Sequence, residues 1–120
     1  VGFEMLINWD LPVILCEGAF DAMTIKRNAI PLFGKKISPA LMKQLIKCKS
    51  KSIYLALDDD ALLDAFEHAK KFISMGKKVY LLEMDGKDPN EMGFEKFNEV
   101  LFKAQPITTA DLMRKRLSLS

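Results

Sequence analysis

Short apolar runs recur along the chain, and the segments between them repeat their apolar residues every three or four positions. A nearly continuous apolar run is typical of a strand in a sheet that is covered on both faces. Alternation of apolar and polar residues is typical of a strand with one solvent-exposed face. The runs in this chain are nearly continuous, so they predict buried strands. They extend from Pro12 to Cys16, Ala29 to Phe33, Ser52 to Leu57 and Lys78 to Met84.

The segments between the runs predict helices with recognisable ends. Ser38 followed by Pro39 is typical of an N-cap and a first helical position. The clearest amphipathic stripe extends from Ala61 to Met75, and Gly76 supplies a C-terminal stop there. Further helices are expected from Ala19 to Arg27, from about Phe94 to Ala104 with Pro106 as its end, and from Thr108 or Thr109 through Arg116.

Strands that alternate with helices predict an α/β fold, with an open, mainly parallel four-stranded sheet flanked by helices. A length of 120 residues suits one domain, and a hydrophobic fraction of 49% is ample for a core. We expect a leader segment at 1–10, a domain at 11–105, and a C-terminal helix or the start of a following domain at 106–120. No apolar run approaches the roughly 18 residues of a membrane span, so we expect no membrane partner.

The formal net charge of +2 conceals blocks of opposite charge. Residues 1–21 carry four acids and no Lys or Arg, and residues 22–57 carry eight Lys or Arg and no acid. Residues 58–99 carry eleven acids and six bases. Such division predicts that acids and bases serve different sites. With only two cysteines and one histidine, a Cys/His zinc site is excluded, and nothing in the cysteine usage implies an oxidising compartment.

Carboxylates follow three of the four predicted strands. Glu17 ends the first strand, with Asp21 one turn into the next helix, and three consecutive aspartates that include Asp58 and Asp60 end the third strand. The loop after the fourth strand contains Asp88. Ligands bind at the carboxyl ends of parallel strands, and clustered carboxylates repel unless a cation lies between them. The pattern therefore predicts a site for a hard divalent ion such as Mg²⁺.

Each carboxylate taken alone also has a structural interpretation. Asp59 or Asp60 would cap the helix that follows, and an aspartate before a helix is more often a cap than a metal ligand. Asp85-Gly86 and Asp88-Pro89 are ordinary turn residues. The coincidence of carboxylates at three strand ends favours the metal site.

The order of these motifs resembles a Toprim domain, the metal-binding catalytic fold of bacterial-type primases, topoisomerases and some nucleases. An apolar strand followed by Glu-Gly occupies residues 13–18, and a strand followed by Asp-x-Asp occupies residues 53–60. Residues 29–34 resemble the second strand and glycine turn of the family, and residues 86–91 resemble the acidic Asp-Pro loop of primases, including phage primases. One position departs from the primase pattern, because Leu63 stands where a glycine is frequent.

The resemblance implies the activity of a DNA primase, which joins ribonucleoside triphosphates into an RNA primer on a single-stranded DNA template. It implies that Glu17, Asp58 and Asp60 are catalytic and hold Mg²⁺ or Mn²⁺, and that Asp88 and Asp21 complete the site. It also implies a larger parent chain, a replicative helicase as partner, and a cytoplasmic location in a bacterial cell or a phage-infected host. The isolated fragment is expected to bind metal but to synthesise little or no primer.

The acid-free block adds a complementary set of charges. Lys35 and Lys36 follow Gly34, and together with Lys87 they are candidates for binding a nucleotide triphosphate or nucleic acid. Lys43 and Lys47 are interpreted instead as a solvated helix face near the carboxyl end of that helix.

Two proteins with a similar fold class fit the sequence less well. A response-regulator receiver requires a Lys-Pro step after a late strand, which the chain lacks. A haloacid-dehalogenase-type phosphatase carries its Asp-x-Asp on the first strand, with Thr or Val soon after it. Two alternatives that share the Toprim fold stay open: a nuclease that cleaves nucleic acid with the same acids, and a non-catalytic module for nucleic-acid binding or assembly.

Overall fold

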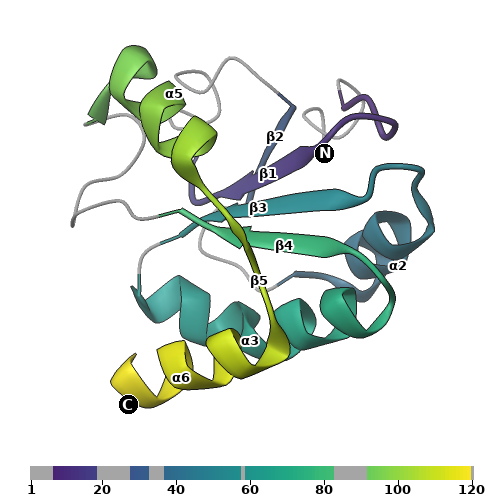
Figure 1. The fold of residues 1–120 in the computed structure, drawn as a ribbon. Coiled ribbons are helices and arrows are strands. Elements are labelled where there is room, and N and C mark those ends of the chain that lie inside the picture. The colour runs from purple at the N-terminus through teal and green to yellow at the C-terminus, as the bar shows by residue number, and fades with distance from the viewer. Residues whose placement is uncertain (1–6, 19–27, 33–36, 58, 83–91, 120) are drawn as a thin grey trace.

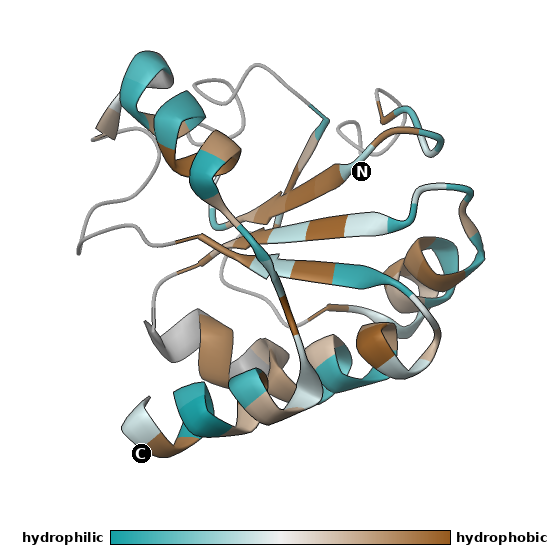
Figure 2. Cartoon of the chain, in the orientation of Figure 1, coloured by the Kyte–Doolittle hydropathy of each residue, from teal (hydrophilic) through white to brown (hydrophobic). Residues whose placement is uncertain are grey.

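A mostly parallel five-stranded sheet forms the centre of the computed structural model, which describes residues 7–18, 28–32, 37–57, 59–82 and 92–119 (Figure 1). The strand order is β2-β1-β3-β4-β5; the first four strands run parallel, and β5 runs antiparallel to β4. β1 is hydrophobic along its whole length (Figure 2). The strands are β1 (Val13–Cys16), β2 (Ala29–Pro31), β3 (Ser52–Ala56), β4 (Lys78–Leu81) and β5 (Pro106–Ile107).

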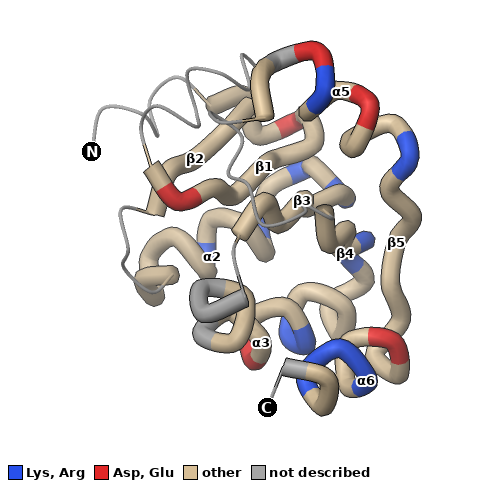
Figure 3. The backbone as a smooth tube through the Cα atoms, turned by 90° about the vertical axis from the view of Figure 1, so that its left-hand side faces the viewer, with Lys and Arg blue, Asp and Glu red and all other residues tan. Residues whose placement is uncertain are grey.

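The sheet has helices on both faces, which confirms the predicted α/β fold class. Figures 1 and 3 show α5 on one face of the sheet and α3 and α6 on the other. The predicted helix from Ala19 to Arg27 lies outside the described residues. The described helices are α2 (Pro39–Lys47), α3 (Asp59–Ser74), α5 (Phe94–Lys103) and α6 (Thr109–Leu119). None of these helices is long and apolar enough to cross a bilayer.

The sequence signals for the ends of α2 and α3 act as expected. The Ser38 hydroxyl accepts a hydrogen bond from the Leu41 amide at 3.1 Å, and Pro39 occupies the first turn, where its missing amide costs nothing. Gly76 follows α3 with φ of 86°, a conformation that residues with a Cβ rarely adopt. The start of α2 and the end of α3 are therefore set by local chemistry and not by packing alone.

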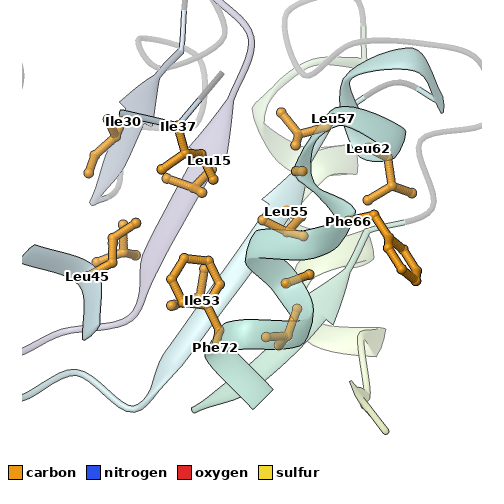
Figure 4. Close-up of a cluster of buried hydrophobic side chains, with 14 of the residues drawn as sticks. Leu15, Ile30, Ile37, Leu45, Ile53, Leu55, Leu57, Leu62, Phe66 and Phe72 are labelled. Carbon is orange, nitrogen blue, oxygen red and sulfur yellow. The ribbon is translucent and has the colours of Figure 1, made fainter. Parts of the chain in front are cut away.

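The larger of two buried clusters lies between the sheet and the helices α2, α3 and α6. Alternate residues of the strands, such as Leu15, Ile53 and Leu55, face this cluster, and Leu45 and Phe72 reach them from α2 and α3 (Figure 4). Leu45 and Phe72 are both fully buried. Burial of several large side chains at one helix–sheet interface is the main source of stability for a domain of this size.

The smaller cluster lies on the opposite face, under α5. Cys16, Ala56 and Leu82 form part of it together with Phe97 of α5, which is fully buried. Cys16 and Ala56 are the last residues of β1 and β3, and Leu82 follows β4 directly. The helix α5 thus packs beneath the carboxyl ends of three strands.

The segment before β1 is tied to the other end of the sheet. The side-chain amide of Asn28 donates to the carbonyl of Asn8 at 2.7 Å, and its oxygen accepts from the amide of Asn8 at 2.8 Å. The amide of Ser50 donates to the carbonyl of Trp9 at 2.9 Å. Residues 7–11 are therefore held against the amino ends of β2 and β3.

A capping box begins α6. The Thr108 hydroxyl accepts from the amide of Asp111 at 3.1 Å, and the Asp111 carboxylate accepts from the amide of Thr108 at 3.2 Å. The amide of Thr108 foremost, then its hydroxyl and the charge of Arg114, hold the pKa of Asp111 below its ordinary value. The ionised form is therefore favoured in the folded state.

The lowered pKa predicts a pH dependence of stability. Its contribution is fully present above the ordinary carboxylate pKa of about 4 and is lost as the pH falls through the lowered value. Asp111→Asn is expected to lower the urea midpoint at pH 6, and its difference from the wild type should shrink progressively below about pH 4. Asp10→Asn removes a carboxylate from an exposed turn and is the control. A difference that is constant across this range would contradict the assignment.

Candidate functional site

The pairing of β1 with β3 brings two of the sequence motifs to neighbouring strands. Cys16 and Ala56, the last residues of the two strands, are paired in register. Glu17 and Leu57, the residues that follow them, therefore continue two adjacent strands at the same edge of the sheet. The amide of Leu82 donates to the carbonyl of Leu55 at 3.1 Å, which extends the pairing of β3 with β4 to this edge as well.

Glu17 is held at the end of β1 by firm backbone connections. Cys16 before it is fully buried, and its carbonyl accepts a hydrogen bond from the amide of Leu32 at 2.8 Å. Glu17 and Gly18 are half-buried. Because β1 is paired on both sides, the backbone position of Glu17 is well defined. A catalytic or metal-binding side chain requires such a rigid attachment point.

Buried leucines stand on both sides of the aspartate segment in the sequence. Leu57 precedes it and Leu62 follows it, and both belong to the larger core cluster. The helix α3 begins at Asp59, so its amino end, which favours negative charge, opens at the carboxyl edge of the sheet. Leu63, which departs from the primase pattern, has an exposed side chain on α3.

Most of the predicted site residues lie outside the described part of the structure. Of the expected catalytic and metal-binding set, Glu17 is the residue whose surroundings are described. The backbone of Asp60 belongs to the first turn of α3, while its side chain lies outside the description. Within the described residues, no group of three or more metal-ligating side chains occurs. The predicted residues outside the description are Asp21, Asp58, Asp88, Lys35, Lys36 and Lys87.

Phe97 contributes to this region of the fold, although the sequence analysis assigned it no role. It belongs to the same buried cluster as Cys16, Ala56 and Leu82, the residues that end or follow the three strands at the carboxyl edge. The apolar spacing of α5 marks Phe97 as a core residue, but the spacing does not reveal which strand ends it covers. That information comes only from the packing.

Comparisons with known proteins agree with this arrangement. The profile of a family described as Toprim-like matches residues 14–93. A search of curated protein sequences returned no significant match. A search of solved structures found similarity to the crystal structure of the Aquifex aeolicus primase, which comprises zinc-binding and RNA polymerase domains, with a TM-score of 0.66. The identity is 19%, and the match covers 98% of this chain and 33% of that one.

Proposed function

Because the chain belongs to the Toprim-like family, we propose that it is the metal-binding catalytic domain of a DNA primase. The observation that carries the proposal is the register of β1 and β3. In the sequence, Glu17 follows one of these two paired strands and the aspartate segment follows the other, which supports the proposal. The similarity in fold to the Aquifex aeolicus primase over 98% of the chain supports it.

The donor set fits a hard divalent cation. The candidate ligands Glu17, Asp58 and Asp60 are all carboxylates, with Asp88 and Asp21 as further oxygen donors, and Mg²⁺ and Mn²⁺ prefer such ligands. Bound divalent ions neutralise phosphate charge and stabilise the leaving oxygen in nucleotidyl transfer. The half-buried position of Glu17 supports its inclusion, because partial desolvation strengthens the attraction between a carboxylate and a cation.

The residues of the chain have separate tasks in this proposal. Glu17 accepts the proton of the attacking 3′-hydroxyl of the primer as a general base, or is instead an acidic side chain that would hold the metal ion. Asp58 and Asp60 would hold the divalent ions, which would supply positive charge to the triphosphate of the incoming ribonucleotide. Lys35, Lys36 and Lys87 bind phosphates of the nucleotide or of the nucleic acid. The primer is built on single-stranded DNA.

The parent protein is proposed to be longer than the chain and to act with a replicative helicase in the cytoplasm of a bacterium or of a phage-infected host. The Toprim portion is proposed to extend over residues 11–105, with a leader at 1–10. The chain spans 33% of the primase structure that it resembles. We therefore propose that the 120-residue chain binds metal but synthesises little or no primer on its own.

A Mn²⁺ titration of the 120-residue chain tests the metal site. Mn²⁺ binding followed by electron paramagnetic resonance is expected to weaken by at least about tenfold in Glu17→Gln, because a ligand charge is lost. A larger loss is expected in the double variant Asp58→Asn/Asp60→Asn. Glu95→Gln/Glu99→Gln, which removes two exposed carboxylates from α5, is the control for net charge and should bind as the wild type does. Unchanged affinity in the Asp58/Asp60 variant would refute the site.

A second experiment separates primase from nuclease. The full-length parent is offered a single-stranded template with ribonucleotides, and separately a labelled DNA without them. Primer synthesis supports the proposal, whereas cleavage without synthesis would identify a nuclease. Metal binding without either activity would favour the non-catalytic module.

A further inference from the structure

The ends of two helices meet at the amino edge of the sheet, opposite the carboxyl edge where Glu17 follows β1. Figure 1 shows α2 and the turn from α3 into β4 on the same side of the molecule. The amide of Lys78, at the start of β4, donates to the carbonyl of Lys51, directly before β3, at 2.7 Å. This hydrogen bond holds the segment that follows α2 against the segment that follows α3.

Cys48 ends α2 and is bonded to its last turn. Its amide donates to the carbonyl of Gln44 at 3.0 Å, and its thiol donates to the carbonyl of Leu45 at 3.2 Å. Both bonds satisfy carbonyls that have no partner within the helix. A serine hydroxyl would be an equally good donor, so helix capping does not account for a sulfur atom at this position.

Lys77 has an equally well-defined position after α3. Its amide donates back to the carbonyl of Phe72 at 2.9 Å, and the amide of Gly76 donates to the carbonyl of Ile73 at 3.1 Å. These two bonds form a Schellman motif at the end of the helix. The motif fixes the backbone from which the Lys77 side chain extends.

The amine of Lys77 lies on the end of α2, beside the thiol. Its Nζ donates to the carbonyl of Cys48 at 2.8 Å and to the carbonyl of Ser50, and it lies 3.8 Å from the Cys48 sulfur. Contacts with carbonyls are typical of a base near a helix end, but the contact with sulfur is additional to them. Among the described residues, no carboxylate forms an ion pair with this amine. A nitrogen nucleophile and a thiol therefore lie side by side on two fixed backbones.

The geometry points to a redox modification site at which peroxide joins Cys48 to Lys77 through a sulfur–nitrogen bond. Both side chains are half-buried, and cysteines that react with oxidants typically lie in partly exposed places with cationic neighbours. An oxidised cysteine condenses with a backbone nitrogen when one is close, and the Lys77 amine offers the same atom. Because the amine is held near the sulfur, the step between them is intramolecular and fast.

The reaction has two steps. The Cys48 sulfur attacks hydrogen peroxide, the oxygen–oxygen bond breaks, and the sulfur becomes a sulfenic acid with release of water. The Lys77 ammonium then gives one proton to solvent, and its nitrogen attacks the sulfur. The sulfur–oxygen bond breaks, and the departing hydroxide takes a second proton from the nitrogen as water. Peroxide accepts both electrons that the sulfur loses, and a dithiol reverses the bond because it is itself oxidised to a disulfide.

Peptide mapping of the 120-residue chain after treatment with hydrogen peroxide tests this inference. Trypsin cleaves after an unmodified lysine, so a bond at Lys77 is expected to leave residues 72–78 uncut and joined to the dipeptide Cys48-Lys49. The joined species should weigh less than its two parts by the mass of two hydrogen atoms. Dithiothreitol should restore normal cleavage. The mapping uses the wild-type chain without metal, so failure of the metal site leaves its result standing.

Thermal unfolding gives a second measurement. The bond closes a loop between residues 29 positions apart in the chain, and such a crosslink restricts the unfolded state. The treated wild type is expected to unfold at a temperature higher by about 5 °C or more than Cys48→Ser treated in the same way. Dithiothreitol should remove this difference.

Lys77→Arg is the matched control, because it keeps the positive charge and the donors to the carbonyls of Cys48 and Ser50 but has no amine. It is expected to give no joined peptide and no thermal shift after treatment. A joined peptide that persists in Lys77→Arg would overturn the inference. So would a wild-type Cys48 that stays reduced, that becomes a sulfinic or sulfonic acid with normal cleavage at Lys77, or that forms a disulfide between two chains.

Discussion

Glu17→Gln in the full-length parent is expected to lower the rate of primer synthesis by about a thousandfold or more, with little change in stability. Glutamine has the shape of glutamate but neither accepts a proton nor carries a charge. Glu17 follows a strand that is hydrogen-bonded on both sides, so a neighbouring carboxylate cannot move into its place without breaking the backbone pairing. The measurement is kcat for incorporation of labelled ribonucleotides on a single-stranded template.

The control for this experiment is Glu99→Gln, which removes an exposed carboxylate from α5 and is expected to retain wild-type kcat. Thermal unfolding of both variants verifies that the fold is preserved. A kcat for Glu17→Gln within about tenfold of the wild type would show that this carboxylate is neither the base nor an essential metal ligand.

The strands could be predicted from the sequence because their apolar runs are short and nearly continuous. The predicted strand from Lys78 to Met84 is longer than the observed β4, which ends at Leu81. The apolar pattern continues because Leu82 is buried under α5 although it lies beyond the strand. Burial and strand pairing are different properties, and an apolar run reports only the first.

The edge strand β5 was not predicted, and its pairing explains why. It has two residues, Pro106 and Ile107, which are too few to show any periodicity. They pair with Tyr80 and Val79, far away in the sequence, so the strand depends on a non-local contact. Pro106 was correctly expected to follow the end of a helix; on an edge strand its missing amide is tolerated.

The candidate site could be predicted as a set of motifs but not as an arrangement in space. Each motif is local: a strand followed by Glu-Gly, or a strand followed by aspartates. Whether the two strands are neighbours depends on strand order and register, and the pairing of Cys16 with Ala56 joins residues that lie far apart in the chain. A one-residue change of register would turn every side chain of a strand to the other face of the sheet. The local sequence of one strand does not determine its register with the next.

The same limit applies to the docking of α6 on α3. The run Arg114-Lys115-Arg116 is visible in the sequence, but a run of bases near a chain end is equally typical of a solvated tail. The burial of Leu112 and the position of Arg116 on the Phe66 ring distinguish a docked helix from such a tail. These contacts join α6 to α3, and no local pattern predicts them.

Phe97→Ala is expected to lower the free energy of unfolding by about 3–5 kcal/mol, because it removes a large, fully buried side chain and leaves a cavity. The same helix supplies a matched control. Phe102 is 80% exposed, and Phe102→Ala is expected to change the free energy of unfolding by less than about 0.5 kcal/mol. Urea unfolding followed by circular dichroism measures both values under the same conditions.

The position of Phe97 extends this prediction from stability to the site. It shares a buried cluster with Cys16, which directly precedes Glu17, and with Ala56, which lies two residues before Asp58. A cavity beneath these strand ends should let them shift, so Phe97→Ala is expected to weaken Mn²⁺ binding by about threefold to tenfold in conditions where the variant is still folded. Phe102→Ala should leave Mn²⁺ binding unchanged. If Phe97→Ala loses stability but binds Mn²⁺ as the wild type does, α5 supports the fold without positioning the site, and the carboxyl ends of the strands hold their geometry through sheet pairing alone.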